Sequence, residues 1–141
     1  MIETVFKKEE KINYYKFIVS KADVNFDLHS SSYIGFKENN KIIGAIFFSN
    51  YDQHIVFIHI AFNTPRCVSR KHIKLMFDYI FNQLNCRRAT ATCDSKNNRV
   101  QKLIKGVGFT QEGLIRKMAA INNKEIDVII YGMLKNECRW I

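Results

Sequence analysis

The chain is poor in the residues that form linkers and chain breaks. It has one proline and six glycines among 141 residues, and it has no tract rich in serine and glycine. Flexible connections between domains draw on these residues, and this length suits a single folding unit. Apolar residues make up 47% of the chain, which excludes a disordered class. The sequence therefore predicts one domain over residues 1–141.

Motifs of several other protein classes are also missing. The four cysteines include no CxxC pair, so no zinc or other metal site is expected; they are Cys67, Cys86, Cys93 and Cys138. No run of about 18 apolar residues is present, and the charged start MIETVFKKEEK lacks the apolar core of a signal peptide. These absences predict reduced thiols in a cytoplasmic protein without membrane contact.

Acidic residues are scarce relative to basic ones. The chain has 13 acidic and 22 basic side chains, which gives a formal net charge of +9. An excess of positive charge favours anionic partners, namely a phosphorylated cofactor, a nucleic acid or an acidic protein. A lysine-rich solvated surface explains the same charge equally well.

The first half of the chain changes its hydrophobic period near residue 33. Residues 5–20 have the spacing of one or two amphipathic helical turns, and residues 23–32 are polar and turn-like. Three strand-like runs follow between residues 33 and 62, and the gaps between them hold Asn39–Asn40 and Asp52–Gln53. We therefore expect two antiparallel hairpins. The runs 42–48 and 55–62 are nearly all apolar, as in strands covered on both faces.

The middle of the chain has the strongest helical pattern. Apolar side chains recur from Ile73 to Leu84 at helical spacing, and Ser69 is positioned to cap the first turn. The segment RRATATCD at 87–94 alternates like a strand. A strand, a helix of about four turns and a second strand form a βαβ unit, whose two strands run parallel.

The last third begins with NNRVQKLIKGVGFTQEG, residues 97–113. Its apolar residues predict a second amphipathic helix that ends at Gly108, where a left-handed residue commonly closes a helix. A strand should follow from Phe109 through residues 113–116, and a last strand should span 125–134 after a turn at Asn122–Asn123. The expected fold is α/β (α+β), with a single mixed, mostly antiparallel sheet around a central parallel βαβ unit.

This series of residues resembles the GNAT superfamily of N-acetyltransferases over residues 30–140. The matching pattern is Asn97-x-x-Val100-x-x-Leu103-Ile104-x-x-x-Gly108-Phe109, then Glu112-Gly113 and Arg116, with the ending IIYGMLKNECRW. The ending looks like a phage-encoded branch similar to ribosomal-protein N-terminal acetyltransferases. The resemblance implies an acyl-CoA N-acyltransferase fold, acetyl-CoA as cosubstrate, an amine acceptor, a monomer or homodimer, and the host cytoplasm if the protein is phage-encoded.

The resemblance also implies which residues bind acetyl-CoA. Arg66 matches the start of the family's phosphate-binding loop, but Ser69 and Lys71 replace its glycines. Arg70 would join Arg66 and Lys71 in binding the pyrophosphate at the start of the long helix, where backbone N–H groups and the helix dipole favour anions. The strand before that helix would contact the thioester, and the second helix would pack on the pantetheine arm; these residues are Ile60, Ala61, Phe62, Leu103 and Ile104.

Two residues are the candidates for catalysis. His59 interrupts an apolar strand where the family often places its base, and Asn97 would point at the thioester. A histidine satisfied within the sheet and an asparagine that only caps a helix are the simpler interpretations. Ile104 occupies the position where the family has a tyrosine that acts as the general acid. Tyr131 on the last strand could take that role instead, although a tyrosine on a strand more often belongs to the hydrophobic core.

Two other functions remain open at this point. The charge of +9, the missing glycines and Arg87–Arg88 beside aromatic-rich strands suit a basic nucleic-acid-binding module, which the sequence favours less than the enzyme. An inactive protein that binds a host factor through a retained fold is the other alternative. The acceptor is an unidentified amine: a protein N-terminus, a lysine or a small amine, with an acidic macromolecule mildly favoured.

Overall fold

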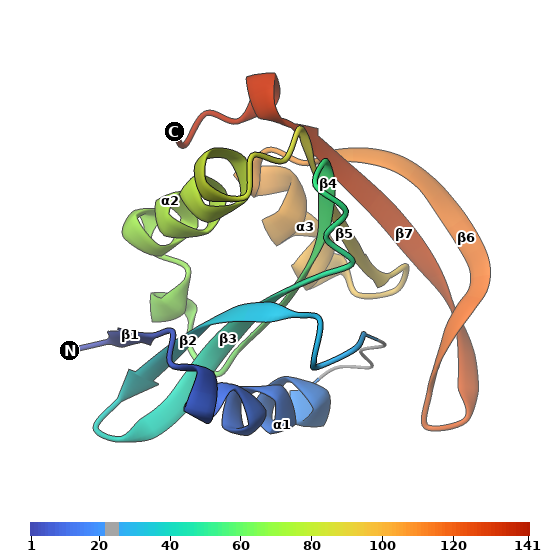
Figure 1. Ribbon diagram of the computed structural model, residues 1–141. Helices are drawn as coiled ribbons and strands as arrows, with labels where there is room; N and C mark the ends of the chain where they lie inside the picture. The colour runs from blue at the N-terminus through green and yellow to red at the C-terminus, as the bar shows by residue number, and fades with distance from the viewer. Residues whose placement is uncertain (22–25) are drawn as a thin grey trace.

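A computed structural model describes residues 1–21 and 26–141 and shows one seven-stranded sheet with helices on both faces (Figure 1). The strand order is β1-β2-β3-β4-β5-β7-β6. Among the strands of the described residues, only β4 and β5 pair in parallel, and the other neighbours are antiparallel. This arrangement confirms the predicted fold class.

The elements have the following bounds. The strands are β1 Glu3–Val5, β2 Ser32–Glu38, β3 Lys41–Ser49, β4 Ile55–Phe62, β5 Arg88–Asp94, β6 Thr110–Ile121 and β7 Lys124–Leu134. The helices are α1 Lys11–Lys21, α2 Arg70–Asp78, which continues as a π-helical turn over Tyr79–Gln83, and α3 Asn98–Val107. Short 3-10 turns occur at Lys8–Glu10, Pro65–Cys67 and Lys135–Glu137.

Local side-chain chemistry sets the turns and helix ends where the sequence predicts them. Asn39 and Asn40 both adopt positive φ, at 53° and 62°, and close the β2–β3 hairpin. Ser69 Oγ accepts the His72 N–H at 3.3 Å, which caps α2. Gly108 ends α3 with φ of 118°, a conformation that glycine adopts without steric cost. These three predictions are confirmed.

Two predicted segments differ from the structure. The helix expected over residues 5–20 begins only at Lys11, because Val5 is drawn into β1, where it pairs with Gly35 and is buried. Pairing to a sheet edge thus overrides the helical spacing of this segment. Part of the turn predicted over 23–32 lies outside the described residues, and β2 begins at Ser32.

Strand β6 is also longer than expected. It continues to Ile121 instead of ending near Arg116, because two register shifts let it stay paired with β7. Lys117 lies within the second shift with φ of 54°, and its N–H donates to Asp127 Oδ1 at 2.9 Å. A bulge of this kind accommodates extra residues and bends the strand, and Figure 1 shows β6 and β7 curving away from the rest of the sheet.

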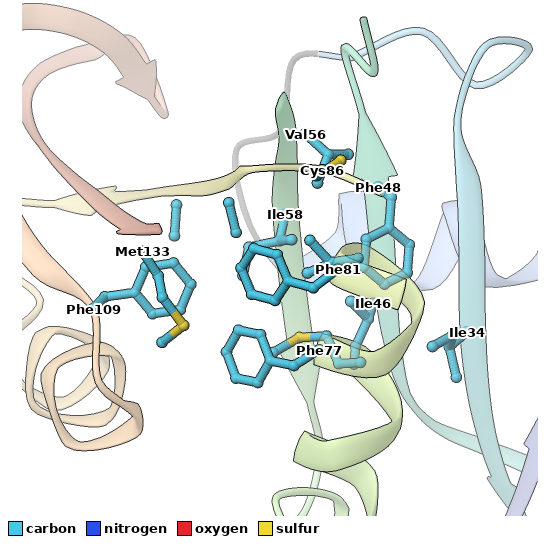
Figure 2. Packing of buried hydrophobic residues seen from close by; sticks show 14 of the residues in the cluster. Ile34, Ile46, Phe48, Val56, Ile58, Phe77, Phe81, Cys86, Phe109 and Met133 are labelled. Carbon is cyan, nitrogen blue, oxygen red and sulfur yellow. The ribbon is translucent and has the colours of Figure 1, made fainter. Parts of the chain in front are cut away.

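In the part of the chain that the structure describes, the core consists of two apolar clusters, one on each face of the sheet. The larger cluster packs α2 and α3 against the sheet; Figure 2 shows its central residues, which include Phe77, Phe81, Ile58, Phe109 and Met133. The smaller cluster lies under α1 and contains Tyr14, Ile18, Tyr33, Ala45, Phe47 and Ala61. Strand β3 is buried continuously from residue 43 to 49, as predicted for a strand covered on both faces.

The parallel pairing of β4 and β5 ends before either strand does. The last paired residues are Ile58 and Ala91, whereas β4 continues to Phe62 and β5 continues to Asp94. Beyond this branch point each strand remains paired only with its outer neighbour, β3 or β7. The sheet therefore divides at its centre.

We predict that Gly35→Ala destabilises the fold. A Cβ at this position would lie 2.4 Å from Tyr14 Cε1, and the Tyr14 ring is buried and cannot move aside freely. The free energy of unfolding, measured by urea denaturation, should fall by about 1–3 kcal/mol. Gly106→Ala in α3 is the matched control, because nothing lies within 4 Å of its new Cβ. It should stabilise the protein by about 0.5–1 kcal/mol; equal effects of both variants would contradict the prediction.

Candidate functional site

The division between β4 and β5 exposes backbone groups at the centre of the sheet. The Asn63 N–H donates to Ile43 O at 2.8 Å, so residues 43 and 63 form a hydrogen-bonded pair. Hydrogen-bonded pairs alternate along an antiparallel ladder, so Ala61 and His59 also direct their backbone groups toward β3. The N–H and C=O groups of Ile60 and Phe62 therefore face the gap. Of the three β4 residues expected to contact the thioester, Ile60 and Phe62 thus direct their backbone groups into the gap, whereas Ala61 directs its backbone groups toward β3.

Two helices begin beside this gap. Helix α2 follows β4 and α3 follows β5, and the carboxyl ends of two parallel strands lie at the same edge of a sheet. The first turns of both helices contain no acidic residue, and they present the exposed cations Arg70, Lys71 and Arg99. A positive side chain at a helix N-terminus opposes the helix dipole. An anion at this edge would relieve that repulsion at both helices.

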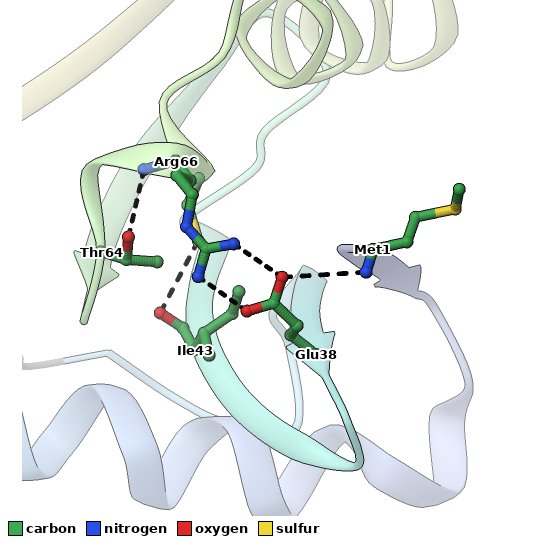
Figure 3. Close-up of polar contacts among 6 residues, drawn as sticks. Met1, Glu38, Ile43, Thr64 and Arg66 are labelled. Atoms are coloured by element: carbon green, nitrogen blue, oxygen red, sulfur yellow. Dashed lines mark hydrogen bonds and ion pairs between the residues drawn. The ribbon is translucent and has the colours of Figure 1, made fainter.

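Arg66, the expected phosphate ligand, is engaged elsewhere. Its guanidinium forms two hydrogen bonds of 2.7 Å each with the Glu38 carboxylate, and the Met1 amino group lies 3.9 Å from the same carboxylate (Figure 3). The pKa of Glu38 is lowered, first by the hydrogen bonds from Arg66. Arg66 therefore ties the turn after β4 to the end of β2, which leaves Arg70 and Lys71 as the cations at the start of α2.

His59 lies on the α1 face of the sheet, within the smaller cluster. Its Nε2 shares a hydrogen bond of 2.7 Å with Ser49 Oγ, and its ring stacks on Phe26 with centroids 4.4 Å apart. Burial lowers the pKa of His59 to about 4, so the imidazole is neutral at physiological pH. Neither partner is evident from the sequence, because the Ser49 contact depends on the register of the β3–β4 hairpin and Phe26 comes from a distant segment.

The α3 face presents a different chemistry. Ile104 packs against the larger cluster, Leu103 is partly exposed, and Asn97 Oδ1 accepts the Val100 N–H at 3.2 Å as the cap of α3. Cys93 and Tyr131 belong to the same cluster, and Tyr131 is fully buried. The sheet therefore separates His59 from the face where the residues expected to bind the cofactor lie. The gap between β4 and β5 is the place where the two faces meet.

The C-terminal tail forms a contact that sequence reasoning missed. Trp140 Nε1 donates to Val107 O at 2.8 Å, and Arg139 donates to Gly106 O, so the tail caps the carbonyl end of α3. The guanidinium of Arg70 lies over the Trp140 ring at 5.9 Å. The residues CRW alone do not predict this contact, because the position of the tail depends on where the chain folds back.

Within residues 1–21 and 26–141, no group of three or more His, Cys, Asp and Glu side chains is arranged to hold a metal ion. No helix in this part of the chain is long and apolar enough to cross a membrane. All four cysteines are free thiols, and burial raises the pKa of each, which keeps them protonated.

Comparisons by sequence connect the chain to uncharacterised relatives. No known family model matches it. The chain is 28% identical over 106 residues to the uncharacterised N-acetyltransferase p20 of Bacillus licheniformis, and 26% identical over 105 residues to the uncharacterised N-acetyltransferase YnaD of Bacillus subtilis strain 168. Each match covers 72% of this chain. The matched regions span only 60% and 62% of the two relatives' own lengths.

Comparisons by structure identify the fold. A spermidine N-acetyltransferase SpeG variant from Vibrio cholerae superimposes with a TM-score of 0.80 at 13% identity, over 96% of this chain and 94% of that one. A protein described as a probable acetyltransferase superimposes with a TM-score of 0.74 at 15% identity, again over 96% and 94%. The fold is that of the GNAT acyltransferases, as the resemblance implied. Curated names and structural neighbours together support the resemblance to that superfamily.

The pKa of His59 leads to a pH-dependent stability. Its value falls from 6.5 to about 4 on folding, so the unfolded chain binds more protons between these limits and stability declines as pH falls through this window. Lowering the pH from 7.5 to about 5 should cost about 2 kcal/mol at this residue. We expect His59→Gln to lose about that much of the pH dependence in urea unfolding, relative to the wild type. His54→Gln, at an exposed site, is the control; equal pH dependence of the wild type and His59→Gln would show that burial does not depress this pKa.

Proposed function

We propose that this chain is an acetyl-CoA-dependent N-acetyltransferase that moves an acetyl group to a primary amine by direct attack on the thioester. The observation that supports this most strongly is the division of β4 and β5 beyond Ile58 and Ala91, with two cation-bearing helix starts at the same edge. The relatives' names support the reaction class. Acetyl-CoA would supply the acetyl group already activated as a thioester.

The residues around the gap suit an extended, amide-containing ligand with a phosphate end. Ile60 and Phe62 offer backbone donors and acceptors that have no partner on β5. A pantetheine arm could therefore pair with β4 in the way that a neighbouring strand does. At the start of α2, Ser69 occupies the His72 N–H, while Arg70 and Lys71 bring side-chain charge. Charge-assisted contacts from these two side chains would replace the contacts that a glycine loop makes through its backbone.

The acceptor amine would approach from the α1 face. There His59 is neutral at physiological pH, so its Nδ1 can accept a hydrogen bond when Nε2 carries the proton and donates to Ser49 Oγ. A group with a pKa of about 4 is a weak base, so His59 would hold the amine or a water molecule, and solvent would take most of the amine's proton. The Ile60 N–H would stabilise the charge that develops on the thioester oxygen.

The charge of the chain bears on the kind of acceptor. Among the structural neighbours, SpeG is described as a spermidine N-acetyltransferase, but a net charge of +9 opposes the approach of a polyamine to this chain. An amine carried by an acidic macromolecule, such as the N-terminus of an acidic protein, fits this charge better. Similarity to ribosomal-protein N-terminal acetyltransferases, a phage origin, a cytoplasmic location and a monomeric or homodimeric state stay predictions.

Calorimetric titration with acetyl-CoA and desulfo-CoA tests the proposal. We expect binding in the micromolar range for the wild type and roughly tenfold weaker binding for Arg70→Gln, since one charge-assisted phosphate contact is lost. Arg66→Gln should weaken binding less, because Glu38 already holds that guanidinium. Lys16→Gln, a substitution of a lysine in α1, is the matched control of charge and should have no effect.

Two outcomes would contradict this assignment. Absence of binding at millimolar acetyl-CoA would rule out an acetyl-CoA-dependent enzyme, and the basic surface would then be the main indication of function. Steeply salt-dependent binding of DNA or RNA would then favour the nucleic-acid alternative, and binding of neither would favour the inactive interaction protein. A larger loss from Arg66→Gln than from Arg70→Gln would mean that Arg66 leaves Glu38 when the cofactor binds.

A further inference from the structure

The positive charge of the chain is concentrated in one layer of the fold. Residues 63–84 and 95–109, which contain α2 and α3, hold eight of the 22 basic side chains and only Asp78 of the 13 acidic ones. In the remaining segments the basic and acidic side chains nearly balance. A surface that serves solubility intersperses both signs of charge. The layer formed by α2 and α3 is therefore a single-sign surface, which is the kind that attracts a polyanion.

Helix α3 contributes an outward side that has no role in the core. Ile104 and Val107 pack against the larger cluster. At 3.6 residues per turn, Lys102, Lys105 and Gly106 fall on the opposite side of the helix, and all three are exposed. We call these three residues the outer face of α3. Neither lysine forms an ion pair within residues 1–21 and 26–141.

The C-terminal tail extends the outer face of α3. Arg139 is exposed and donates to Gly106 O, so its guanidinium lies at the end of the row that the two lysines form. Trp140 is partly exposed, and the hydrogen bond from its Nε1 to Val107 O fixes the edge of its ring. The guanidinium of Arg139 lies 4.9 Å from the centroid of the Trp140 ring. A fixed indole beside cations is a surface on which a nucleic-acid base can stack.

These cations are unfavourable for the isolated helix. Side chains three residues apart are neighbours on a helix, and like charges at such spacing destabilise it. The cofactor of the proposed function would lie in the gap between β4 and β5, on the side of α3 that faces the sheet, so it would not reach Lys102 and Lys105. An anionic partner on the outer face of α3 would offset the repulsion between them.

The composition of the outer face distinguishes between the possible polyanions. A helix that binds a membrane inserts an apolar side beside its basic one, but the apolar side of α3 already packs against the core. A protein partner needs apolar anchors at the centre of its interface, and Lys102, Lys105 and Gly106 provide none. A single strand of nucleic acid needs cations that follow its backbone and an aromatic ring that stacks a base. The outer face and the tail supply both.

We propose that Lys102, Lys105 and Arg139 bind the phosphates of a single-stranded nucleic acid, and that one of its bases stacks on Trp140. This surface lies outside the gap between β4 and β5, so the inference goes beyond the proposed acetyl transfer and does not depend on it. A duplex offers the same phosphates but keeps its bases paired, so it should bind less tightly than a single strand.

The fluorescence of Trp140 tests the proposal directly, because this residue is the only tryptophan in the chain. A strand of about 12 thymidines should quench it to saturation, and log K should fall with log salt at a slope of about −2, as three phosphate contacts predict. The double variant Lys102→Gln/Lys105→Gln should bind about tenfold more weakly at low salt, with a slope near about −0.7. Lys8→Gln/Lys16→Gln removes the same charge from exposed positions elsewhere and should bind like the wild type.

Further ligands separate the proposal from its alternatives. An abasic strand of the same length should bind with little quenching, and both double variants should bind acetyl-CoA like the wild type. Equal losses in the two double variants, a parallel loss of acetyl-CoA affinity in Lys102→Gln/Lys105→Gln, or binding of phosphatidylserine vesicles in place of the strand would overturn the proposal. Acetyl transfer without strand binding would refute this inference alone. Strand binding without acetyl-CoA binding would support it and refute the proposed function.

Discussion

The end of the hydrogen-bonded ladder between β4 and β5 is the constraint on which the site depends. Up to Ile58 and Ala91 the parallel pair holds the centre of the sheet together, and beyond them each strand follows its outer neighbour. Backbone groups inside a sheet must find partners, so a divided centre is stable only where water or a ligand can supply them. The same division places the starts of α2 and α3 beside the gap, since each helix continues from one of the separated strands.

The division also allows the two faces of the sheet to hold different chemistry. On the α1 side, His59 is kept neutral by burial and is fixed by Ser49. On the α3 side, Tyr131 keeps its proton in an apolar cluster. A continuous sheet would separate these groups completely. Because the strands part between them, the proposed acetyl transfer would bring an acceptor from one face and a cofactor from the other to the backbone of Ile60.

The sequence predicted the features that depend on neighbouring residues. Asn39–Asn40, Ser69 and Gly108 act within four residues of their own positions, and each does what its chemistry indicates. The apolar runs located the central strands, and the helical spacing located α2 and α3. The start of α1 was misjudged because pairing of β1 with β2 decided it, and the length of β6 was misjudged because two register shifts keep it paired with β7. For the candidate site, the resemblance to acetyltransferases indicated residues of β4, the start of α2 and α3, and their binding of a cofactor stays a prediction.

Contacts between side chains were beyond the reach of the sequence because they follow from strand register. Arg66 was expected to face a phosphate, but the turn after β4 lies beside the end of β2, where Glu38 receives it. A shift of one residue in the β2–β3 register would turn Glu38 to the opposite face and release Arg66. The ion pair consequently explains how a loop without glycines is held in place. A glycine loop binds phosphate through its backbone, whereas here the loop is tied to the sheet, and in the proposed function Arg70 and Lys71 would bind the anion. Such a site depends more on side-chain charge than on backbone geometry, so its affinity should be more sensitive to salt.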